Sequence, residues 1–188
     1  MRKIIFMIHV SLDGYIAGPN GEMDWINYNE EIETYAHSMH ARTDTAIYGR
    51  VTYEMMAGYW PNVFNDPNAT EGDMRHAKWV HDARKIVVSN TLDEVSWHNT
   101  SLIKGDFVDA VTKLKQETGK DMWLLGSPTL AQACLKHHLI DEYRLNINPV
   151  ILGDGKKLFG PDPYKFQLAD SKIFSGGVVG LTYVPAVS

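Results

Sequence analysis

The stretch TDTAIYGRVTYE, from Thr43 to Glu54, decides the predicted fold. Its apolar run stops at Gly49, and a guanidinium and a hydroxyl group follow at once, on Arg50 and Thr52. A short apolar run that ends at glycine is typical of a buried strand, and the residues after it can begin a helix. The segments KIVVSNT and MWLLGSPT end in the same way. Three such ends predict one edge of a parallel sheet that carries free backbone amides and hydroxyl groups.

Composition limits the class of protein. The chain has 188 residues, 44% of them hydrophobic, which is ample for a sizeable core, so we expect a single domain over residues 1–188. One cysteine, Cys134, allows neither an intrachain disulfide nor a thiolate metal cluster, and it fits a cytoplasmic location. No run approaches the roughly 20 apolar residues of a membrane span. A net charge of −5 without a long basic run argues against nucleic-acid binding.

Apolar runs alternate with helical patterns along the chain. The predicted strands are Lys3–Val10, Thr45–Tyr48, Lys85–Val88, Met122–Leu125, Tyr143–Leu152 and Val178–Val184. The predicted helices are Glu30–Ala41, a helix between Asp106 as N-cap and Gly119 as C-terminal glycine, and Pro128–His138. This alternation implies parallel crossovers, and strands without a polar face imply a sheet covered on both sides.

Two segments depart from the alternation. KIFSGGVVGLTYV predicts two antiparallel strands around a turn at Ser175, Gly176 and Gly177, and therefore an antiparallel edge. The segment Pro61–Gly72 predicts an inserted loop, because the strands on both sides belong to one sheet.

The residues at the three turns suit a phosphate ligand. Gly49 and Gly126 let a phosphate approach the backbone, and Arg50 offers the planar fork that a phosphate monoester accepts. Hydroxyl donors are Thr52, Ser89, Thr91, Ser127 and Thr129. The alternative is three ordinary strand-to-helix turns, since these residue types are also common caps. The chain contains neither G-x-G-x-x-G after the first strand nor a P-loop, which excludes a standard Rossmann or P-loop ligand site.

Five motifs together resemble the dihydrofolate reductase-like superfamily, in the branch that shares the C-terminal reductase domain of bacterial riboflavin biosynthesis. They are SLDGYIA, GRVTYE, VVSNTL, LLGSPTLAQACL and LIDEYRLNINPVILGDGKKLF, and in this order they cover essentially the whole chain. The resemblance implies an α/β fold of three αβα layers, dihydrofolate reductase-like, with a mixed, mainly parallel sheet and an antiparallel C-terminal edge hairpin. It also implies a homodimer.

The same resemblance implies an NADPH-dependent oxidoreductase. The hydride acceptor would be a small pterin- or pyrimidine-like molecule, as for 5-amino-6-(5-phosphoribosylamino)uracil reductase or dihydrofolate reductase. By resemblance, Arg50 contacts the 2′-phosphate and Thr52 the pyrophosphate, while Gly126 takes an unusual backbone geometry and Ser127 donates its hydroxyl. The residues implied to bind NADPH are Ile16, Ala17, Gly49, Arg50, Thr52, Ser89, Asn90, Thr91, Gly126, Ser127, Thr129 and Leu130. The deaminase motifs that often accompany this reductase are absent.

Three acids are candidates for the proton donor. Counting forward from the landmark Trp25 gives Glu30, whereas counting backward from Gly49 gives Glu33. Asp13 in SLDG is the third candidate. A carboxyl group buried against nicotinamide and substrate is expected to have a raised pKa. The residues expected to contact substrate are Trp25, His37 and Tyr53.

The predicted helix Glu30–Ala41 allows another interpretation. Glu30, Glu33, His37 and His40 share one face, which could bind zinc or another divalent metal. We nevertheless expect no metal, because three ligands on one helix rarely converge without a fourth from elsewhere, and His76 and His81 do not share a helical phase. A non-catalytic module that binds NADPH or another nucleotide is a further alternative.

Overall fold

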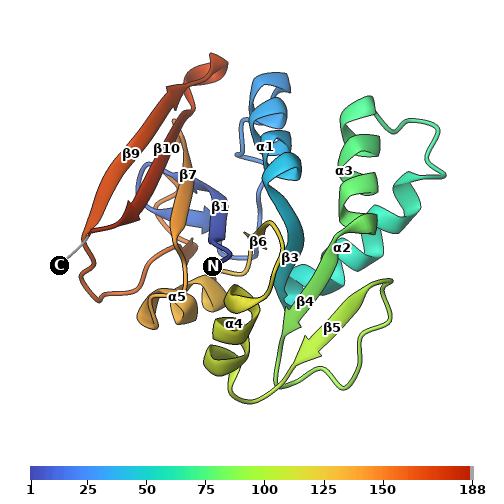
Figure 1. Ribbon diagram of the computed structural model, residues 1–188. Helices are drawn as coiled ribbons and strands as arrows, with labels where there is room; N and C mark the ends of the chain where they lie inside the picture. The colour runs from blue at the N-terminus through green and yellow to red at the C-terminus, as the bar shows by residue number, and fades with distance from the viewer. Residues whose placement is uncertain (187–188) are drawn as a thin grey trace.

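The fold is built on one sheet of eight strands, seen in Figure 1, in a computed structural model that describes residues 1–186. The strand order is β5-β4-β3-β6-β1-β7-β10-β9. The bounds are β1 Ile4–Ser11, β3 Thr43–Gly49, β4 Arg84–Val88, β5 Thr100–Ile103, β6 Asp121–Leu125, β7 Glu142–Asn148, β9 Phe166–Ile173 and β10 Val179–Pro185. A second sheet of two strands pairs β2 (Tyr15–Ala17) with β8 (Lys156–Lys157).

The helices connect these strands and cover both faces. They are α1 Glu30–Arg42, α2 Arg50–Val63, α3 Glu71–Asp82, α4 Phe107–Gln116 and α5 Pro128–Lys136, with a short 3₁₀ turn at Ser175–Gly177. Strands β1 and β3 to β7 pair in parallel, whereas β10 pairs antiparallel with β7 and with β9. The predicted mixed sheet with an antiparallel C-terminal hairpin is confirmed.

Alternate residues of the central strands face opposite layers. On β1, Ile4 and Phe6 pack in a core with α4 and α5, while Ile5 and Met7 pack on the other face with Met39 of α1. Both sets are buried, so the strand shows a continuous apolar run instead of an alternating one. Figure 1 shows α1, α2 and α3 on one side of the sheet and α4 and α5 on the other. The predicted three-layer αβα arrangement is confirmed.

The predicted loop Pro61–Gly72 is wrong at both ends. Helix α2 continues through Pro61 to Val63, and α3 already begins at Glu71. A proline near the end of a helix removes only one late hydrogen bond, so the last turn survives. The predicted strand to Leu152 is also too long, because β7 ends at Asn148, directly before a proline that cannot donate to a ladder.

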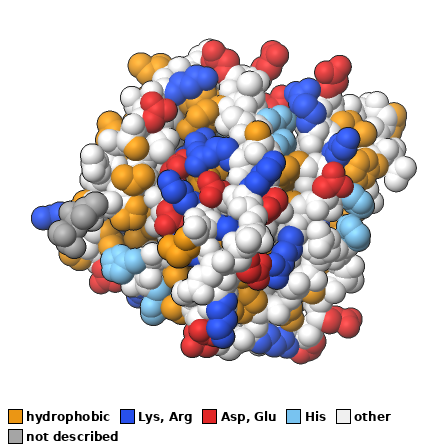
Figure 2. All heavy atoms as spheres, viewed as in Figure 1, with side chains coloured by type: hydrophobic (Ala, Val, Ile, Leu, Met, Phe, Trp, Pro, Cys, Tyr) orange, Lys and Arg blue, Asp and Glu red, His pale blue; other side chains and the backbone are white. Residues whose placement is uncertain are grey.

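The outer surface carries mixed charge. On the face shown in Figure 2, lysine and arginine side chains are interspersed with acidic ones. No helix within residues 1–186 is long and apolar enough to cross a membrane. The edge strand β9 exposes Leu168 and Ile173, a surface that suits the predicted homodimer, which stays a prediction.

Candidate cofactor and substrate site

Three strand ends meet at one edge of the sheet. Strand β3 lies between β4 and β6 and is parallel to both, with Gly49 opposite Val88 and Ile47 opposite Leu124. Parallel neighbours end on the same edge, so the turns after the three strands lie side by side. The predicted convergence of these turns is confirmed.

The turns after β3 and β6 approach so closely that only glycine fits. A Cβ atom on Gly49 would lie 2.2 Å from Ser127 Oγ, and one on Gly126 would lie 3.1 Å from Thr52 Oγ1. Gly126 has the predicted positive φ, +57°. Ser127 also has a positive φ, 54°, so the expectation that Gly126 alone takes this geometry is wrong. Each glycine therefore makes room for a side chain at the other turn, Gly49 for Ser127 and Gly126 for Thr52.

The helices that begin at these two turns have free N-termini. Within residues 1–186, α1, α3 and α4 have side-chain caps from Asn29, Thr70 and Asp106, and each carries an acid in its first turn. Helices α2 and α5 have neither feature. Their first-turn amides and the positive ends of their dipoles are therefore available to an anion, at the turns where Arg50 and Thr129 stand.

The side chain of Arg50 is exposed beside the first of these turns. Its guanidinium group forms an ion pair with Glu54, one turn along α2, at 3.0 Å. An exposed pair of this spacing contributes only about 0.5 kcal/mol, so a phosphate group can displace the carboxylate. Thr52 is buried next to Gly126, where its hydroxyl faces the β6 turn.

Side-chain hydrogen bonds to backbone amides stabilise the turn after β4. Ser89 Oγ accepts hydrogen bonds from the backbone amides of Thr91 and Leu92, at 3.2 and 3.1 Å. Asn90 Oδ1 accepts one from the amide of Gly105 at 2.8 Å. Ser89 and Asn90 therefore shape the turn, and the exposed Thr91 hydroxyl lies 3.3 Å from Ser89 Oγ.

Three further residues that are predicted to contact the cofactor have buried side chains. Ile16 and Ala17 are buried in β2, and a Cβ atom on Gly155 would lie 2.1 Å from the Ala17 oxygen, so the residue directly before β8 packs closely against this strand. Leu130 is buried in the core under α5. These three residues can reach a ligand only through main-chain groups.

A cleft of about 440 Å³ opens next to the strand ends, between α1, α2, α3 and the sheet. Glu33 and His37 line it, and Leu125 joins it to the β6 turn. Its other lining residues are Met7, Ile8, His9, Tyr28, Ala36, Met56, Tyr59, Trp60, Gly72, Asp73, His76 and Trp123. Burial raises the pKa of Tyr28 to about 12, aided by the charges of Glu33 and Asp73, so its hydroxyl stays neutral and can donate.

The three candidate acids occupy different places. Glu33 lines the cleft, whereas Glu30 is exposed in the first turn of α1. Asp13 accepts hydrogen bonds from Ser11 Oγ and from the amides of Leu152 and Gly153. The Ser11 bond and then these amides lower the pKa of Asp13 to about 2, the opposite of the raised pKa expected for a proton donor.

Two predicted substrate contacts lie away from the cleft. The hydroxyl of Tyr53 accepts hydrogen bonds from the amides of Ser96 and Trp97, at 3.1 and 3.2 Å, in a buried cluster under α2. Trp25 Nε1 donates to the Glu22 oxygen at 3.1 Å. Neither residue lines the cleft, so the structure favours structural roles for both.

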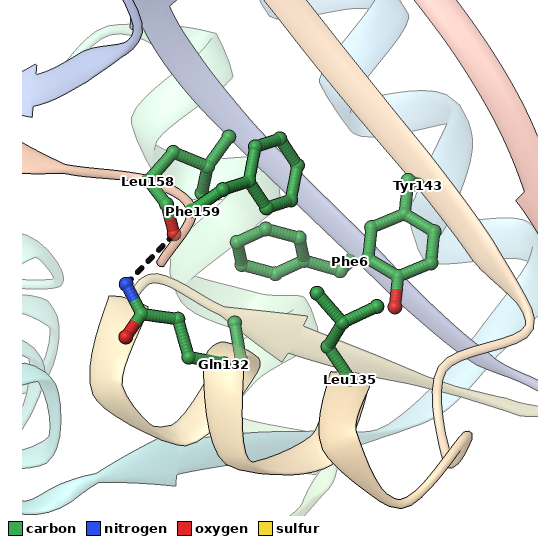
Figure 3. Close-up of a pocket in the computed structure, with 7 residues that line it drawn as sticks. Phe6, Gln132, Leu135, Tyr143, Leu158 and Phe159 are labelled. Carbon is green, nitrogen blue, oxygen red and sulfur yellow. Dashed lines mark hydrogen bonds between the residues drawn. The ribbon is translucent and has the colours of Figure 1, made fainter. Parts of the chain in front are cut away.

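Figure 3 shows a second crevice, which is a packing seam. Leu135 of α5 packs against Phe6 and Tyr143 of the sheet, and Gln132 Nε2 donates to the Leu158 oxygen at 2.9 Å. It has no room for a water molecule. The cleft on the opposite face is therefore the candidate substrate site.

Comparison with known proteins identifies the family. Residues 2–179 match the RibD C-terminal domain. The chain belongs to this family. Two uncharacterized proteins of Bacillus subtilis (strain 168) are similar: YyaP is 35% identical over 184 residues, 97% of this chain and 94% of YyaP. YwjB is 31% identical over 188 residues, 98% of this chain and 99% of YwjB.

Solved structures share the fold of this RibD C-terminal domain. A protein of Shewanella sp. PV-4 provisionally assigned to riboflavin biosynthesis has a TM-score of 0.76 and 26% identity, over 98% of this chain and 99% of that one. The deaminase/5-amino-6-(5-phosphoribosylamino)uracil reductase of Thermotoga maritima has a TM-score of 0.69 and 18% identity, over 98% of this chain but 57% of that one. The reductase-like branch predicted from the sequence motifs is confirmed.

The position of Glu33 in this RibD C-terminal domain depends on a glycine of α3. A Cβ atom on Gly72 would lie 1.6 Å from Glu33 Oε1, the end of a flexible side chain. Gly72→Ala is therefore expected to displace the carboxylate with little change in stability, and to lower kcat/KM of a reductase roughly 10- to 100-fold. Steady-state kinetics and thermal melting check this. Gly58→Ala on α2, where a Cβ would contact nothing within 4 Å, is the matched control; an equal loss there would contradict it.

His9 makes the domain sensitive to acid. Burial lowers the pKa of His9 from 6.5 to about 4, and its Nδ1 accepts a hydrogen bond from the side-chain Nδ2 of Asn148 at 3.2 Å. Between these pH values the unfolded chain binds a proton that the folded chain does not, so stability present above pH 6.5 is lost as the pH falls toward 4. The loss is on the order of 2 kcal/mol. His9→Gln, which can accept the same bond without titrating, is expected to lose less on acidification in melts from pH 7 to 4.5; parallel losses would contradict this.

The sequence did not point to several cleft residues. Asp73 and His76 come from α3, a helix that was not predicted, and Tyr59 and Trp60 come from the second half of α2. The available signal was the capping box of α3, in which Thr70 and Asp73 bond each other's backbone amides.

Proposed function

We propose that the protein is an NADPH-dependent reductase that delivers hydride to a small, planar, pterin- or pyrimidine-like molecule without a phosphate group. The observation that carries the proposal is the edge where β4, β3 and β6 end, with two uncapped helix N-termini beside a cleft that contains Glu33. Membership in the RibD C-terminal domain family supports the reductase class.

The proposed NADPH site is supported by the turns after β3 and β6, which contain Gly49 and Gly126. Amides at the starts of α2 and α5 are suited to the pyrophosphate, and Arg50 is suited to the 2′-phosphate that distinguishes NADPH from NADH. Gly49 leaves room for the Ser127 hydroxyl and Gly126 for Thr52, which brings two hydroxyl groups to these turns. NADPH would supply the hydride, and the chain's part is to bind and orient.

The substrate half rests on the chemistry of the cleft. Aromatic and apolar side chains dominate its lining, with two carboxylates, Glu33 and Asp73. No lysine or arginine is among the described residues that line it. A phosphate placed there would meet two acidic side chains and no basic one, which is unfavourable, whereas a planar ring with N–H donors would meet acceptors and stacking surfaces. This argues for a neutral or cationic heterocycle.

Glu33 is the group best placed to manage a proton. It is the one candidate acid among the described lining residues, and it faces the neutral hydroxyl of Tyr28 across the same cleft. We assign it the roles of holding an N–H group of the substrate and of supplying a proton after hydride transfer.

The test is oxidation of NADPH in the presence of matched pairs of acceptors. Pterins and aminopyrimidines are each tested as hydride acceptors, with and without a ribosyl phosphate substituent. We expect turnover with the unsubstituted member and at least 10-fold lower kcat/KM with the phosphorylated member. A preference for the phosphorylated member would overturn the substrate class. Tight NADPH binding without turnover of any acceptor would favour the nucleotide-binding module.

A further inference from the structure

Three histidine rings meet at the floor of the cleft. His37 and His40 lie one turn apart on α1, and His76 lies on α3. One ring nitrogen of each lies within 4.8 Å of one from each of the others. The His37 and His40 rings stack with centroids 4.7 Å apart. Figure 2 shows histidine side chains next to hydrophobic ones where α1 and α3 face each other.

The hydrogen bonds of the cluster leave a ring nitrogen without a partner among the described residues. His40 Nε2 and His76 Nδ1 share one hydrogen bond, at 3.0 Å. His37 Nδ1 is buried and has no partner among the described residues. A buried polar nitrogen left without a partner costs about 1–3 kcal/mol, so a native structure is expected to use it.

We propose that His37, His40 and His76 form a binding site for a divalent transition metal ion whose remaining coordination position faces the cleft. Three imidazoles with one open position is the ligand set of many zinc sites that act on substrates. The all-nitrogen set favours zinc, cobalt, nickel or copper and disfavours magnesium and calcium, which require oxygen ligands.

The surroundings shield the cluster from solvent. His76 is buried, and His37 and His40 are half-buried. Aromatic rings enclose the cluster, with Trp60 4.3 Å from His76 and Trp79 5.1 Å from His40 between centroids. Asp73 and Arg75 of α3 and Glu33 of α1 are the charged side chains whose fields act on these rings.

Binding needs only small movements of side chains. Nitrogen ligands about 2 Å from a tetrahedral ion lie about 3.3 Å apart. The His40 and His76 nitrogens are already close to that spacing, and a nitrogen of His37 lies within 4.8 Å of each of them. His37 and His76 line the cleft while His40 lies behind them, so a bound ion would polarise a carbonyl or ring nitrogen of a substrate there. The binding site does not depend on the reductase proposal.

The experiment titrates tag-free protein, first stripped with a chelator, with Co²⁺. We expect one ion per chain, the visible absorption bands of tetrahedral cobalt, and displacement of these bands by one equivalent of Zn²⁺. His76→Gln and His37→Gln are each expected to weaken binding at least about 100-fold. His81→Gln is the matched control, because this exposed histidine of α3 stacks on His98, outside the cleft. Circular dichroism of the stripped variants verifies folding.

Two results would overturn the site. One is the absence of saturable 1:1 binding in the wild-type protein at micromolar Co²⁺. The other is equal affinity in wild type, His37→Gln and His81→Gln. If His76→Gln does not fold, the half-buried His37 decides the outcome by itself. If the wild-type protein binds Co²⁺ but oxidises NADPH with no acceptor, the proposed reductase is contradicted and the metal site is not.

Discussion

Glu33→Gln is expected to lower kcat about 100- to 10,000-fold and to leave NADPH affinity unchanged. The substitution keeps the size of the side chain and removes its ability to give up a proton, and general acid–base groups contribute this range of rate. Glu33 is the candidate acid that lines the cleft, and it lies apart from the turns after β3 and β6. Steady-state oxidation of NADPH measures kcat, and fluorescence titration measures NADPH affinity.

The matched controls are the other two candidate acids. Glu30→Gln, on the exposed first turn of α1, is expected to retain full activity. Asp13→Asn is expected to lower thermal stability more than kcat, because the carboxylate ties the Leu152 and Gly153 amides to Ser11. A large loss of kcat in Asp13→Asn, with Glu33→Gln fully active, would move the proton donor to the loop.

The strand ends were predictable because their signals are local. An apolar run that stops at Gly49 or Gly126 indicates a buried strand, and the glycine indicates that another part of the chain approaches closely there. The two-sided burial of β1 is equally visible in its continuous apolar run. Local patterns do not order the strands, but parallel crossovers place all their carboxyl ends on one edge, which was enough to predict convergence.

Helix α3 was not predictable from its apolar spacing. Its buried side is made by Gly72, His76, Ala77 and Val80, of which two do not count as apolar in a sequence pattern. The histidine is buried because rings from α1, α2 and β6 surround it, a contact between residues far apart in the chain. The third member of the histidine cluster was therefore invisible to any argument from one helix.

The choice between Glu30 and Glu33 shows the same limit. The two residues lie less than one turn apart on the same face of α1, so helical phase treats them alike. The contact between α1 and α3 separates them, since α3 begins opposite Glu33 and presents Gly72 to its carboxylate. Tertiary packing, absent from the local sequence, selects the acid that enters the cleft.

Arg50→Ala is expected to weaken NADPH binding about 10- to 100-fold and to leave NADH binding unchanged. Hydrogen bonds between arginine and phosphate contribute about 1.5–3 kcal/mol, and NADH lacks the phosphate. In the free protein the guanidinium group is held by Glu54 at 3.0 Å in an exposed pair, which costs little to break. Fluorescence titrations with both nucleotides at two salt concentrations measure the effect, which salt should reduce.

Two variants make the result specific. Arg75→Ala removes an exposed arginine that pairs with Glu71 one turn away on α3, and it is expected to leave the preference for NADPH intact. Glu54→Gln removes the competitor of the phosphate and is expected to bind NADPH at least as tightly as the wild type. If Arg50→Ala kept the preference, the 2′-phosphate would lie elsewhere. Equal, weak binding of NADPH and NADH by the wild type would contradict the proposed cofactor site. The free amides at the starts of α2 and α5 would then bind an anion other than a dinucleotide.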